Sequence, residues 1–345
     1  MRWLLLVTCL GGSGCFTTRY LLQAAGGQYQ LLHEARPLSA VTADPTVPPR
    51  VRALLAKVPA IKRYGQRHGL TPTSNYERYA DLHRSAAVWV VQACARLAFT
   101  PRRWRFPLVG SVPYLGFFDE AAAREYAAQL EAAEDLDVTV RTASAYSTLG
   151  WFRDPVLSTM VPEGPLAFGA LANVILHESV HATVYVPNQS AFNESLASFV
   201  ADELTWRLVV GRAGLDSDEA RAWMESEARG ARVSQALRDT REALDRVYRS
   251  EAADTEKRAQ KERLLTALQR DLGLRRRFNN ADLAGSRDYD DGGPAFSRLL
   301  RACGSVRALL AAVRRLDEAD FAAPQQQPFD AVVDTLAQRA CPTTR

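Results

Sequence analysis

Several features are missing from this chain of 345 residues, and each absence excludes a class of protein. The net charge is only +4, too small to indicate a nucleic-acid-binding protein, and the short basic stretch at 274–277 is typical of a solvated helix end. The five cysteines have no C-x-x-C spacing, so they do not predict a zinc site of their own. After the N-terminal segment no stretch is apolar enough to span a bilayer, and no internal repeat is visible.

Histidine is also scarce, with five residues in the whole chain, yet two of them stand in one motif. Residues 177–181 read H-E-x-x-H, formed by His177, Glu178 and His181. This spacing places both histidines on one face of a helix, where they can bind one Zn²⁺ with Glu178 beside them as a base. The pattern predicts a zinc hydrolase. The alternative is a pair of partly exposed helix histidines beside a solvated glutamate.

The approach to the motif, residues 164–176, predicts a buried helix. It consists mostly of Ala, Leu, Val, Ile and Phe, and Pro165 suits a first helical turn. Polar groups at the end of a buried helix need partners, because leaving them unpaired is costly. A metal ion supplies such a partner.

The third ligand is predicted to be a carboxylate, because no histidine follows His181. The metzincin pattern needs a third histidine six residues after the second, and that position is Pro187. His33, His68 and His83 all precede the motif. A site with two histidines and a glutamate is a known alternative.

Glu194 is the first acidic residue after the motif. A break at 187–188 and a cap at Ser190 predict a second, antiparallel helix that brings Glu194 back to the histidines. Asp202 and Glu203 are fallback ligands further along this helix. Alternatively, Glu194 is a first-turn glutamate favoured by the helix dipole.

In this interpretation Zn²⁺ activates a water molecule, and Glu178 takes its proton as general base and passes it to the leaving amine. A tyrosine, histidine or arginine usually stabilises the oxyanion. With no later histidine, Tyr289 and Tyr146 are the candidates, although each is alternatively a packing tyrosine.

The first fifteen residues resemble an export signal, with one basic residue, a short apolar run and small residues before Cys15. Residues 12–15 resemble a bacterial lipobox, with Gly12 where leucine is usual. They predict removal of residues 1–14 and a lipid on Cys15, which would hold the protein to a membrane of the bacterial cell envelope, facing the periplasm. The alternatives are a plain signal peptide, giving a soluble periplasmic or secreted protein, and an uncleaved anchor.

Three cysteines remain after Cys15. In an exported protein Cys303 could pair with Cys341 while Cys94 stays buried; alternatively all three are buried or reduced thiols.

The expected fold class is α+β and mainly helical, with a zincin-like catalytic core, a small sheet beside the zinc-binding helix, and a long helical hairpin. We expect an N-terminal helical layer over 15–86, the catalytic core over 87–215 and a C-terminal helical region over 216–345.

Periodicity and turn residues predict the individual elements. Helices are expected at 20–36, 50–68 and 119–133, with a helical continuation at 75–83. Strands are expected within 106–118 and at 137–143, and residues 87–91 remain undecided. A helical hairpin is expected between about 216 and 277, either as a lid or partner arm or as a structural layer.

Several blocks, in the right order, resemble a bacterial zinc aminopeptidase family of predicted envelope lipoproteins with gluzincin-like H-E-x-x-H sites. They are residues 20–28, 112–119, 146–155, 177–181, 192–195, 279–281 and Tyr289. The resemblance implies a metallopeptidase with His177, His181 and Glu194 on zinc, Glu178 as general base, and a cleft bordered by 146–154. Peptides are the implied substrates.

Two departures from other zinc peptidases limit what the resemblance implies, the first for the details of the substrate site and the second for the mode of cleavage. The spacing from His181 to Glu194 is shorter than in thermolysin-like enzymes. The glycine-methionine-glutamate-asparagine block with which other zinc aminopeptidases hold the substrate amine is absent. Endopeptidase or restricted oligopeptidase action therefore stands beside aminopeptidase action.

A different class of function also fits the motif, namely a non-catalytic zinc-binding envelope lipoprotein that acts in structure or in partner binding through the hairpin. Glu178 favours the enzyme, because a purely structural zinc site needs no base.

Overall fold

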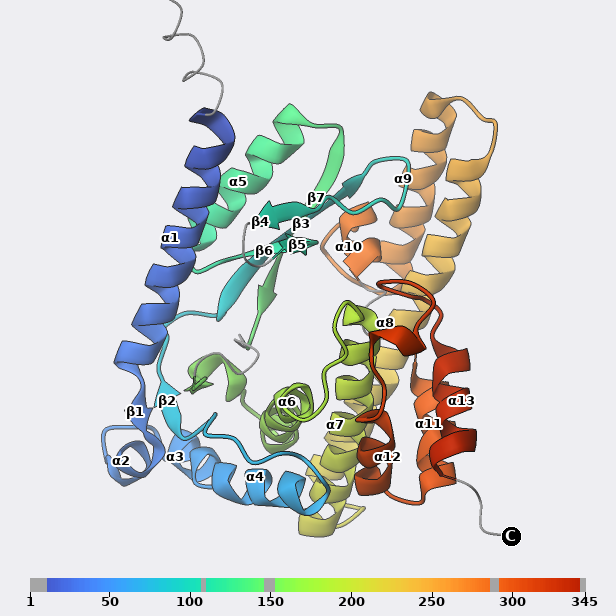
Figure 1. Cartoon of the computed structure of the whole chain (residues 1–345). Coiled ribbons are helices and arrows are strands. Elements are labelled where there is room, and N and C mark those ends of the chain that lie inside the picture. Colours follow the sequence, from blue (N-terminus) through green and yellow to red (C-terminus); the bar gives the residue numbers. More distant parts are fainter. Residues whose placement is uncertain (1–10, 107–109, 146–152, 286–291, 342–345) are drawn as a thin grey trace, which may run out of the picture.

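The structure is a computed structural model that describes residues 11–106, 110–145, 153–285 and 292–341. Helices predominate over three small sheets, which confirms the mainly helical α+β class (Figure 1). Among the described helices, none is both long and apolar enough to cross a bilayer. One hydrophobic core takes buried side chains from Leu31 to Leu336, so the three segments expected from the sequence share it.

The elements follow one another along the chain in the order of their labels. The helices are α1 (Gly11–Glu34), α2 (Leu38–Ala43), α3 (Pro49–Leu55), α4 (Val58–Arg67), α5 (Glu120–Ala133), α6 (Ala167–His181), α7 (Ser190–Ala213), α8 (Asp218–Arg249), α9 (Asp254–Asp271), α10 (Asn280–Gly285), α11 (Gly293–Cys303), α12 (Val306–Val313) and α13 (Asp330–Ala340), with short 3₁₀ turns η1 (Ser158–Met160) and η3 (Glu318–Asp320). The strands are β1 (Arg36–Pro37), β2 (Arg78–Ala80), β3 (Val88–Ala95), β4 (Trp104–Phe106), β5 (Gly110–Val112), β6 (Tyr114–Phe117), β7 (Leu136–Ala143) and β8 (Val156–Leu157).

The sheet β6-β3-β7 is antiparallel throughout and has a hydrophobic core of its own. Its central strand β3 is buried on both faces, so its sequence does not alternate and left residues 87–91 undecided. Helix α5 covers the sheet with Ala123, Ala127 and Leu130, and the carboxylate of Asp119 caps it as expected, accepting a hydrogen bond from the Ala122 N–H.

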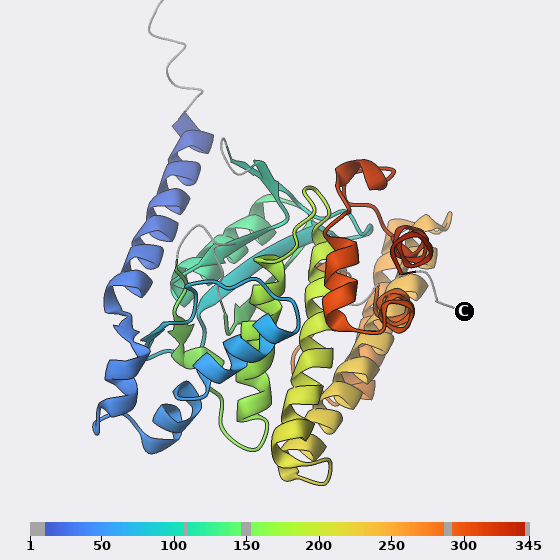
Figure 2. The same cartoon turned by 60° about the horizontal axis from the view of Figure 1, so that its bottom comes forward.

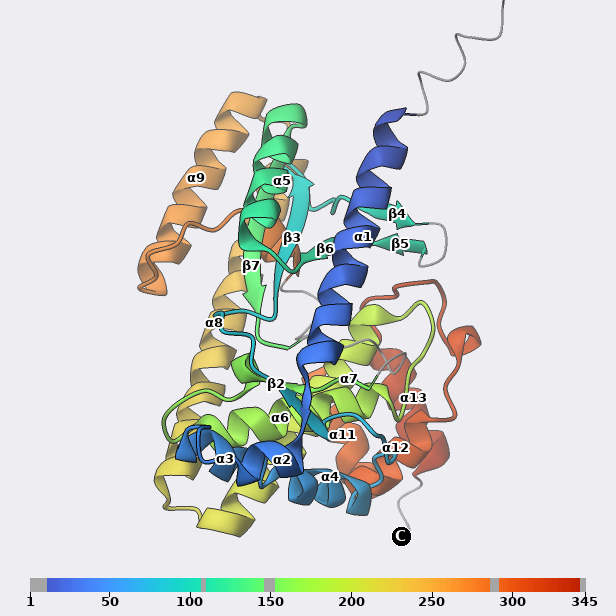
Figure 3. The ribbon, with the colours of Figure 1, turned by 90° about the vertical axis from the view of Figure 1, so that its left-hand side faces the viewer.

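Helix α1 runs along the edge strand β6 (Figure 3). The Gln23 side chain donates to the Gly116 carbonyl at 3.1 Å and accepts from the Phe118 N–H at 3.2 Å, and the Tyr20 hydroxyl accepts from the Gly116 N–H. An unpaired strand edge is prone to pairing with other chains. The two side chains take up hydrogen-bonding groups of this edge and so block it.

A second, smaller sheet has the order β1-β2-β8 and shares the main core with α6. The helical continuation expected at 75–83 is wrong, because this segment contains β2. Tyr79 pairs there with Arg36 of β1 and Val156 of β8. These partners are far away in the sequence, and tertiary pairing overrides local preference.

Two further expectations change in detail. The helix expected at 50–68 is divided into α3 and α4, since Pro59 tolerates only the first turn of a helix and therefore starts a new one. The strands expected at 106–118 and 137–143 exist, but they build β4–β7 around the separate core, whereas the small sheet that shares a core with α6 is β1-β2-β8.

The C-terminal half is helical as expected. Helices α8 and α9 form the predicted hairpin and close a third small core with α10. Cys303 at the end of α11 and Cys341 after α13 form a disulfide, which confirms the predicted pairing, and Cys94 is a buried free cysteine.

The contact between α1 and β6 predicts opposite effects for two adjacent glycines. A Cβ atom on Gly27 would lie 2.1 Å from Cγ of Phe118, whereas one on Gly26 would meet nothing within 4 Å. Gly27→Ala should therefore lower the free energy of unfolding by about 1–3 kcal/mol through overpacking. Gly26→Ala should raise it by about 0.5–1 kcal/mol, because alanine favours the helix. Denaturant unfolding measures both, and equal gains would contradict the close packing of α1 on Phe118.

Candidate metal centre

The helix that carries the motif is anchored by its apolar side chains. Leu171, Ile175, Leu176 and Val180 of α6 are fully buried against the surrounding elements, which include α4, α7 and α8. The helix begins at Ala167, so Pro165 precedes it instead of standing in its first turn. The apolar faces fix the helix in place, and the polar motif at its C-terminal end cannot rotate away.

The chain then turns and enters α7, which lies side by side with α6 (Figure 2, green and yellow-green). Asn193 closes the turn, because its side chain accepts from the Val186 N–H at 2.9 Å and donates to the Val186 carbonyl at 2.8 Å. Ser190 is the first residue of α7 and does not cap it, since the preceding Gln189 is the N-cap and makes no side-chain cap bond. Asn193 thus determines where the next residue, Glu194, lies.

Three side chains converge at this junction. The Nε2 atoms of His177 and His181 are 3.2 Å apart. The Glu194 carboxylate oxygens lie 3.4 Å from Nε2 of His177 and 3.5 Å from Nε2 of His181. The His181 side chain is only 5% exposed, and those of His177 and Glu194 are 17% and 30% exposed. The site is therefore sheltered but reachable.

These distances fit a metal ion. Donor atoms that bond one ion tetrahedrally at about 2.0–2.1 Å lie about 3.3–3.4 Å from one another. The three observed separations, two of which involve different oxygens of Glu194, are close to that value, so one ion can contact all three side chains. Among the described residues this is the one group of three or more histidine, cysteine or acidic side chains arranged to hold a metal.

The charges of the three groups are tightly coupled. Burial opposes ionisation of Glu194, but hydrogen bonds with His177 and His181 outweigh it and lower the pKa of Glu194 to about 2. Burial likewise opposes a charged His177, yet the hydrogen bond to Glu194 and the nearby carboxylates raise its pKa above the usual 6.5. The cluster therefore favours a positive charge next to the Glu194 carboxylate. A bound divalent cation would supply such a charge.

Glu178 follows His177 directly in the chain and so lies beside the cluster. Its Oε2 atom is buried and has no hydrogen-bond partner. A buried polar atom without a partner costs about 1–3 kcal/mol. Such a cost is typical of a group that meets its partner only when a substrate or water binds.

The alternative ligands Asp202 and Glu203 make contacts other than with the cluster. Asp202 accepts a hydrogen bond from Asn173 at 2.7 Å, and Glu203 forms an ion pair with Arg207 within α7. The candidate tyrosines Tyr146 and Tyr289, and most of the 146–154 segment expected to border the cleft, lie outside the described residues.

The histidines before the motif are not brought to the cluster. Nδ1 of His68 pairs with the Tyr64 carbonyl, His33 stacks on Tyr29, and the exposed His83 pairs with Asp81.

Two residues that matter to the site escaped the sequence analysis. Asn193 appeared only within a family block, and Tyr76 fell in a segment expected to be helical. The pKa of Tyr76 is raised well above 10 by its burial and by the nearby carboxylates of Glu178 and Asp154. No local signal in the sequence distinguishes either residue.

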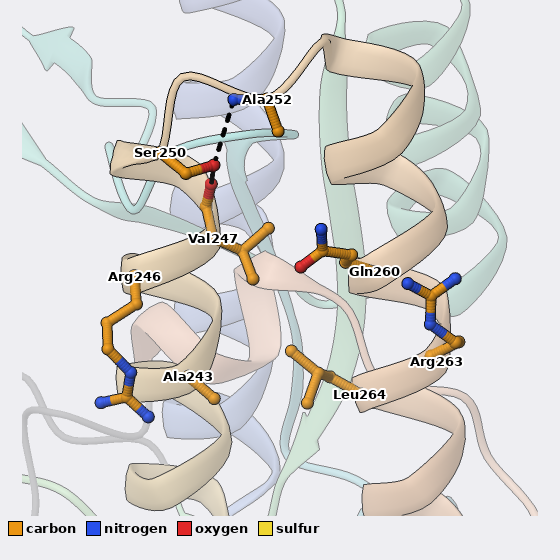
Figure 4. Close-up of a pocket in the computed structure, with 8 residues that line it drawn as sticks. All are labelled: Ala243, Arg246, Val247, Ser250, Ala252, Gln260, Arg263 and Leu264. Carbon is orange, nitrogen blue, oxygen red and sulfur yellow. Dashed lines mark hydrogen bonds between the residues drawn. The ribbon is translucent and has the colours of Figure 1, made fainter.

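A cavity of about 630 Å³ lies elsewhere, between α8 and α9 (Figure 4). Val247, Gln260 and Leu264 point into the gap between the two helices. The lining contains no histidine and no carboxylate, so it offers none of the groups that hydrolysis needs. Its residues are Ala243, Arg246, Val247, Ser250, Ala252, Gln260, Arg263 and Leu264.

The family model described as "Putative aminopeptidase" matches residues 19–327, almost the whole chain. The chain belongs to this family. The match includes all three members of the cluster as well as Glu178 and Tyr76, and the family's name supports a peptidase. No match is found among curated proteins or among solved structures.

The cluster predicts one divalent ion per chain. His181→Ala and Glu194→Gln each remove one of three ligands and should weaken zinc binding at least about 100-fold, more than the loss of an outer-shell contact does. Free zinc at 100 times the wild-type dissociation constant should raise the free energy of unfolding of the wild type by about 2.7 kcal/mol, and that of the variants by about 0.4 kcal/mol or less.

Equilibrium dialysis with metal analysis measures the binding, and thermal unfolding measures the stabilisation. Glu203→Gln is the matched control, because Glu203 is in the same helix and pairs with Arg207 away from the cluster. Wild-type affinity in the Glu194 variant would contradict the proposed ligand set.

Proposed function

We propose that the protein is a zinc-dependent metallopeptidase, acting as an aminopeptidase on peptides in the bacterial cell envelope. One observation supports the catalytic role above all, namely the buried, unpartnered Glu178 oxygen next to a set of three ligand atoms. Structural zinc sites are closed by four protein ligands, whereas catalytic sites have three and leave one position for water or substrate.

The residues divide the chemistry among themselves. His177, His181 and Glu194 would hold the ion, because their atoms have the separations that a zinc ion requires. Zinc in such a site lowers the pKa of water and polarises a carbonyl oxygen. Glu178 accepts the proton of the attacking water and returns it to the leaving amine. The Oε2 atom of Glu178 is buried, which keeps competing solvent away from this oxygen.

The envelope location rests on two features of the chain. Residues 1–15 have the composition of an export signal ending in a lipobox-like sequence, and Cys15 would carry the lipid. The disulfide between Cys303 and Cys341 is typical of proteins outside the cytoplasm. Mass spectrometry of the protein purified from membranes tests the lipid on Cys15.

Glu178→Gln should lower kcat for hydrolysis of unblocked peptides by about 10²–10⁴, because the amide cannot accept the proton. Its zinc content should remain that of the wild type, since Glu178 is not among the three ligands. Glu203→Gln again serves as the matched control and should keep wild-type activity. Equal activity of the Glu178 variant and the wild type would refute the catalytic proposal.

Blocking the substrate amine separates aminopeptidase from endopeptidase action. We expect free peptides to lose residues one by one from the amino end, and N-acetylated copies of the same peptides to resist cleavage. Mass spectrometry of the products records both. Internal cleavage of the acetylated copies would leave the peptidase proposal standing and rule out the aminopeptidase assignment.

A further inference from the structure

Asp202 of α7 is a partly buried carboxylate without a counter-charge of its own. Its Oδ1 atom accepts a hydrogen bond from the Asn173 side chain of α6 at 2.7 Å. Within the part of the chain that the structure describes, its other oxygen accepts no hydrogen bond and no lysine or arginine pairs with it. The imidazole of His177 lies within electrostatic reach, but as a metal ligand it is neutral. A neutral acceptor would satisfy Asn173 without the cost of desolvating a charge, so the fold alone does not explain this carboxylate.

Helical spacing places the Asp202 carboxylate one turn away from the metal cluster. Its partner Asn173 precedes His177 by one turn on the same face of α6, about 6 Å along the helix axis. Asp202 and Glu194 both lie on the side of α7 that contacts α6, and Ser198, midway between them, has a short side chain. The carboxylate and the cluster therefore lie along the same line of contact between two helices that run side by side.

This spacing matches the length of an amino-terminal residue. In a peptide the α-nitrogen lies about 2.5 Å from the carbonyl carbon of the same residue. An ammonium donates to a carboxylate over about 2.7–2.9 Å. A carbonyl group at the metal cluster would therefore bring its own α-ammonium to a carboxylate about 5–6 Å away. An internal residue has an uncharged amide at that position, followed by more chain, and cannot make the same contact.

The charges around the cluster favour a cationic group in this place. With one divalent ion bound, the carboxylates of Glu178, Glu194 and Asp202 leave one negative charge unbalanced. The ammonium of a substrate would balance it. Because a partly buried charge is stabilised when it is paired, this balance favours the complex with a substrate that has a free amine.

Helix α8 brings one more carboxylate to this side of the site. Trp223 of α8 packs on Gly169 of α6, where an added Cβ atom would lie 2.8 Å from its ring. Glu227 is one turn beyond Trp223, and Asn173 is one turn beyond Gly169. Burial first, and then the charge of Asp202, raises the pKa of Glu227 to about 7. A cation bound at Asp202 would relieve this repulsion.

We propose that the carboxylate of Asp202 binds the free α-ammonium of the substrate and so selects peptides by their amino end. This role rests on the proposed peptidase function. It assigns an amine-binding group to a chain that has no glycine-methionine-glutamate-asparagine block. Asn173 is a positioning residue, because its side chain holds Asp202 beside the cluster.

Two zinc-binding inhibitors that differ only in the amine test this role. Leucine hydroxamate and 4-methylpentanohydroxamate have the same side chain and the same metal-binding group, but only the first has an α-amine, which is mostly protonated at pH 7. Calorimetry on the zinc-loaded wild type should show leucine hydroxamate binding about 10–100-fold more tightly, since hydrogen bonds between charged groups are strong. This comparison needs no variant and so does not depend on how a variant folds.

Asp202→Asn keeps an oxygen acceptor for Asn173 and removes only the charge. Leucine hydroxamate should bind this variant about 10–100-fold more weakly, whereas the affinity for 4-methylpentanohydroxamate, the zinc content and the Tm should stay those of the wild type. With leucine 4-methylcoumaryl-7-amide the loss should appear in KM with kcat retained, because the amine is bound equally in the ground state and the transition state.

Glu203→Gln is the matched control. Glu203 is the next residue of the same helix and pairs with Arg207. This variant should keep the wild-type affinities for both hydroxamates.

The outcomes separate this role from the peptidase proposal. Equal wild-type affinities for the two hydroxamates, or an unchanged ratio in Asp202→Asn, would overturn the amine-binding role and leave the zinc site intact. A parallel loss of affinity for both compounds together with a loss of zinc would also overturn it, because Asp202 would then support the metal ligands. If neither compound binds the zinc-loaded wild type, no coordination position is open, and the peptidase proposal fails together with this role.

Discussion

The pairing of Asn193 with the backbone of Val186 is the contact on which the candidate centre depends. It joins the turn after α6 to the first turn of α7 through both atoms of one buried amide. Glu194 follows directly, so the carboxylate reaches the two histidines only if this turn closes correctly. Helix packing fixes the positions of the two histidines, and the side-chain amide of Asn193 fixes the position of Glu194. The geometry of the site therefore depends on rigid apolar helix packing and on one polar contact, the pairing of Asn193 with Val186.

The sequence was most informative where structure follows from short-range spacing or from chemistry. The four-residue separation of His177 and His181, and the first carboxylate after them, indicated which side chains converge. Apolar periodicity located the α8–α9 hairpin, and cysteine chemistry indicated the pair Cys303 and Cys341.

Pairing between segments that are far apart in the sequence could not be predicted. Residues 78–80 form a strand only because residues 36–37 and 156–157 lie beside them, and nothing local in the segment shows this. The same holds for Tyr76, whose left-handed backbone, with a φ angle of +62°, depends on Asp154 and on Lys62 of α4. The fold class could thus be predicted, whereas the division into sheets with separate cores, and the backbone conformation of Tyr76, could not.

Helix α1 gives the fold a further property. Its contacts with β6 begin at Tyr20, only five residues after Cys15, and the helix already includes that position. At the helical rise of about 1.5 Å per residue this is about 8 Å of stiff chain. A lipid on Cys15 would leave almost no slack between the bilayer and the body of the protein. The molecule would then stand at a set height and tilt above the membrane, and the candidate metal centre would lie at a fixed distance from the bilayer.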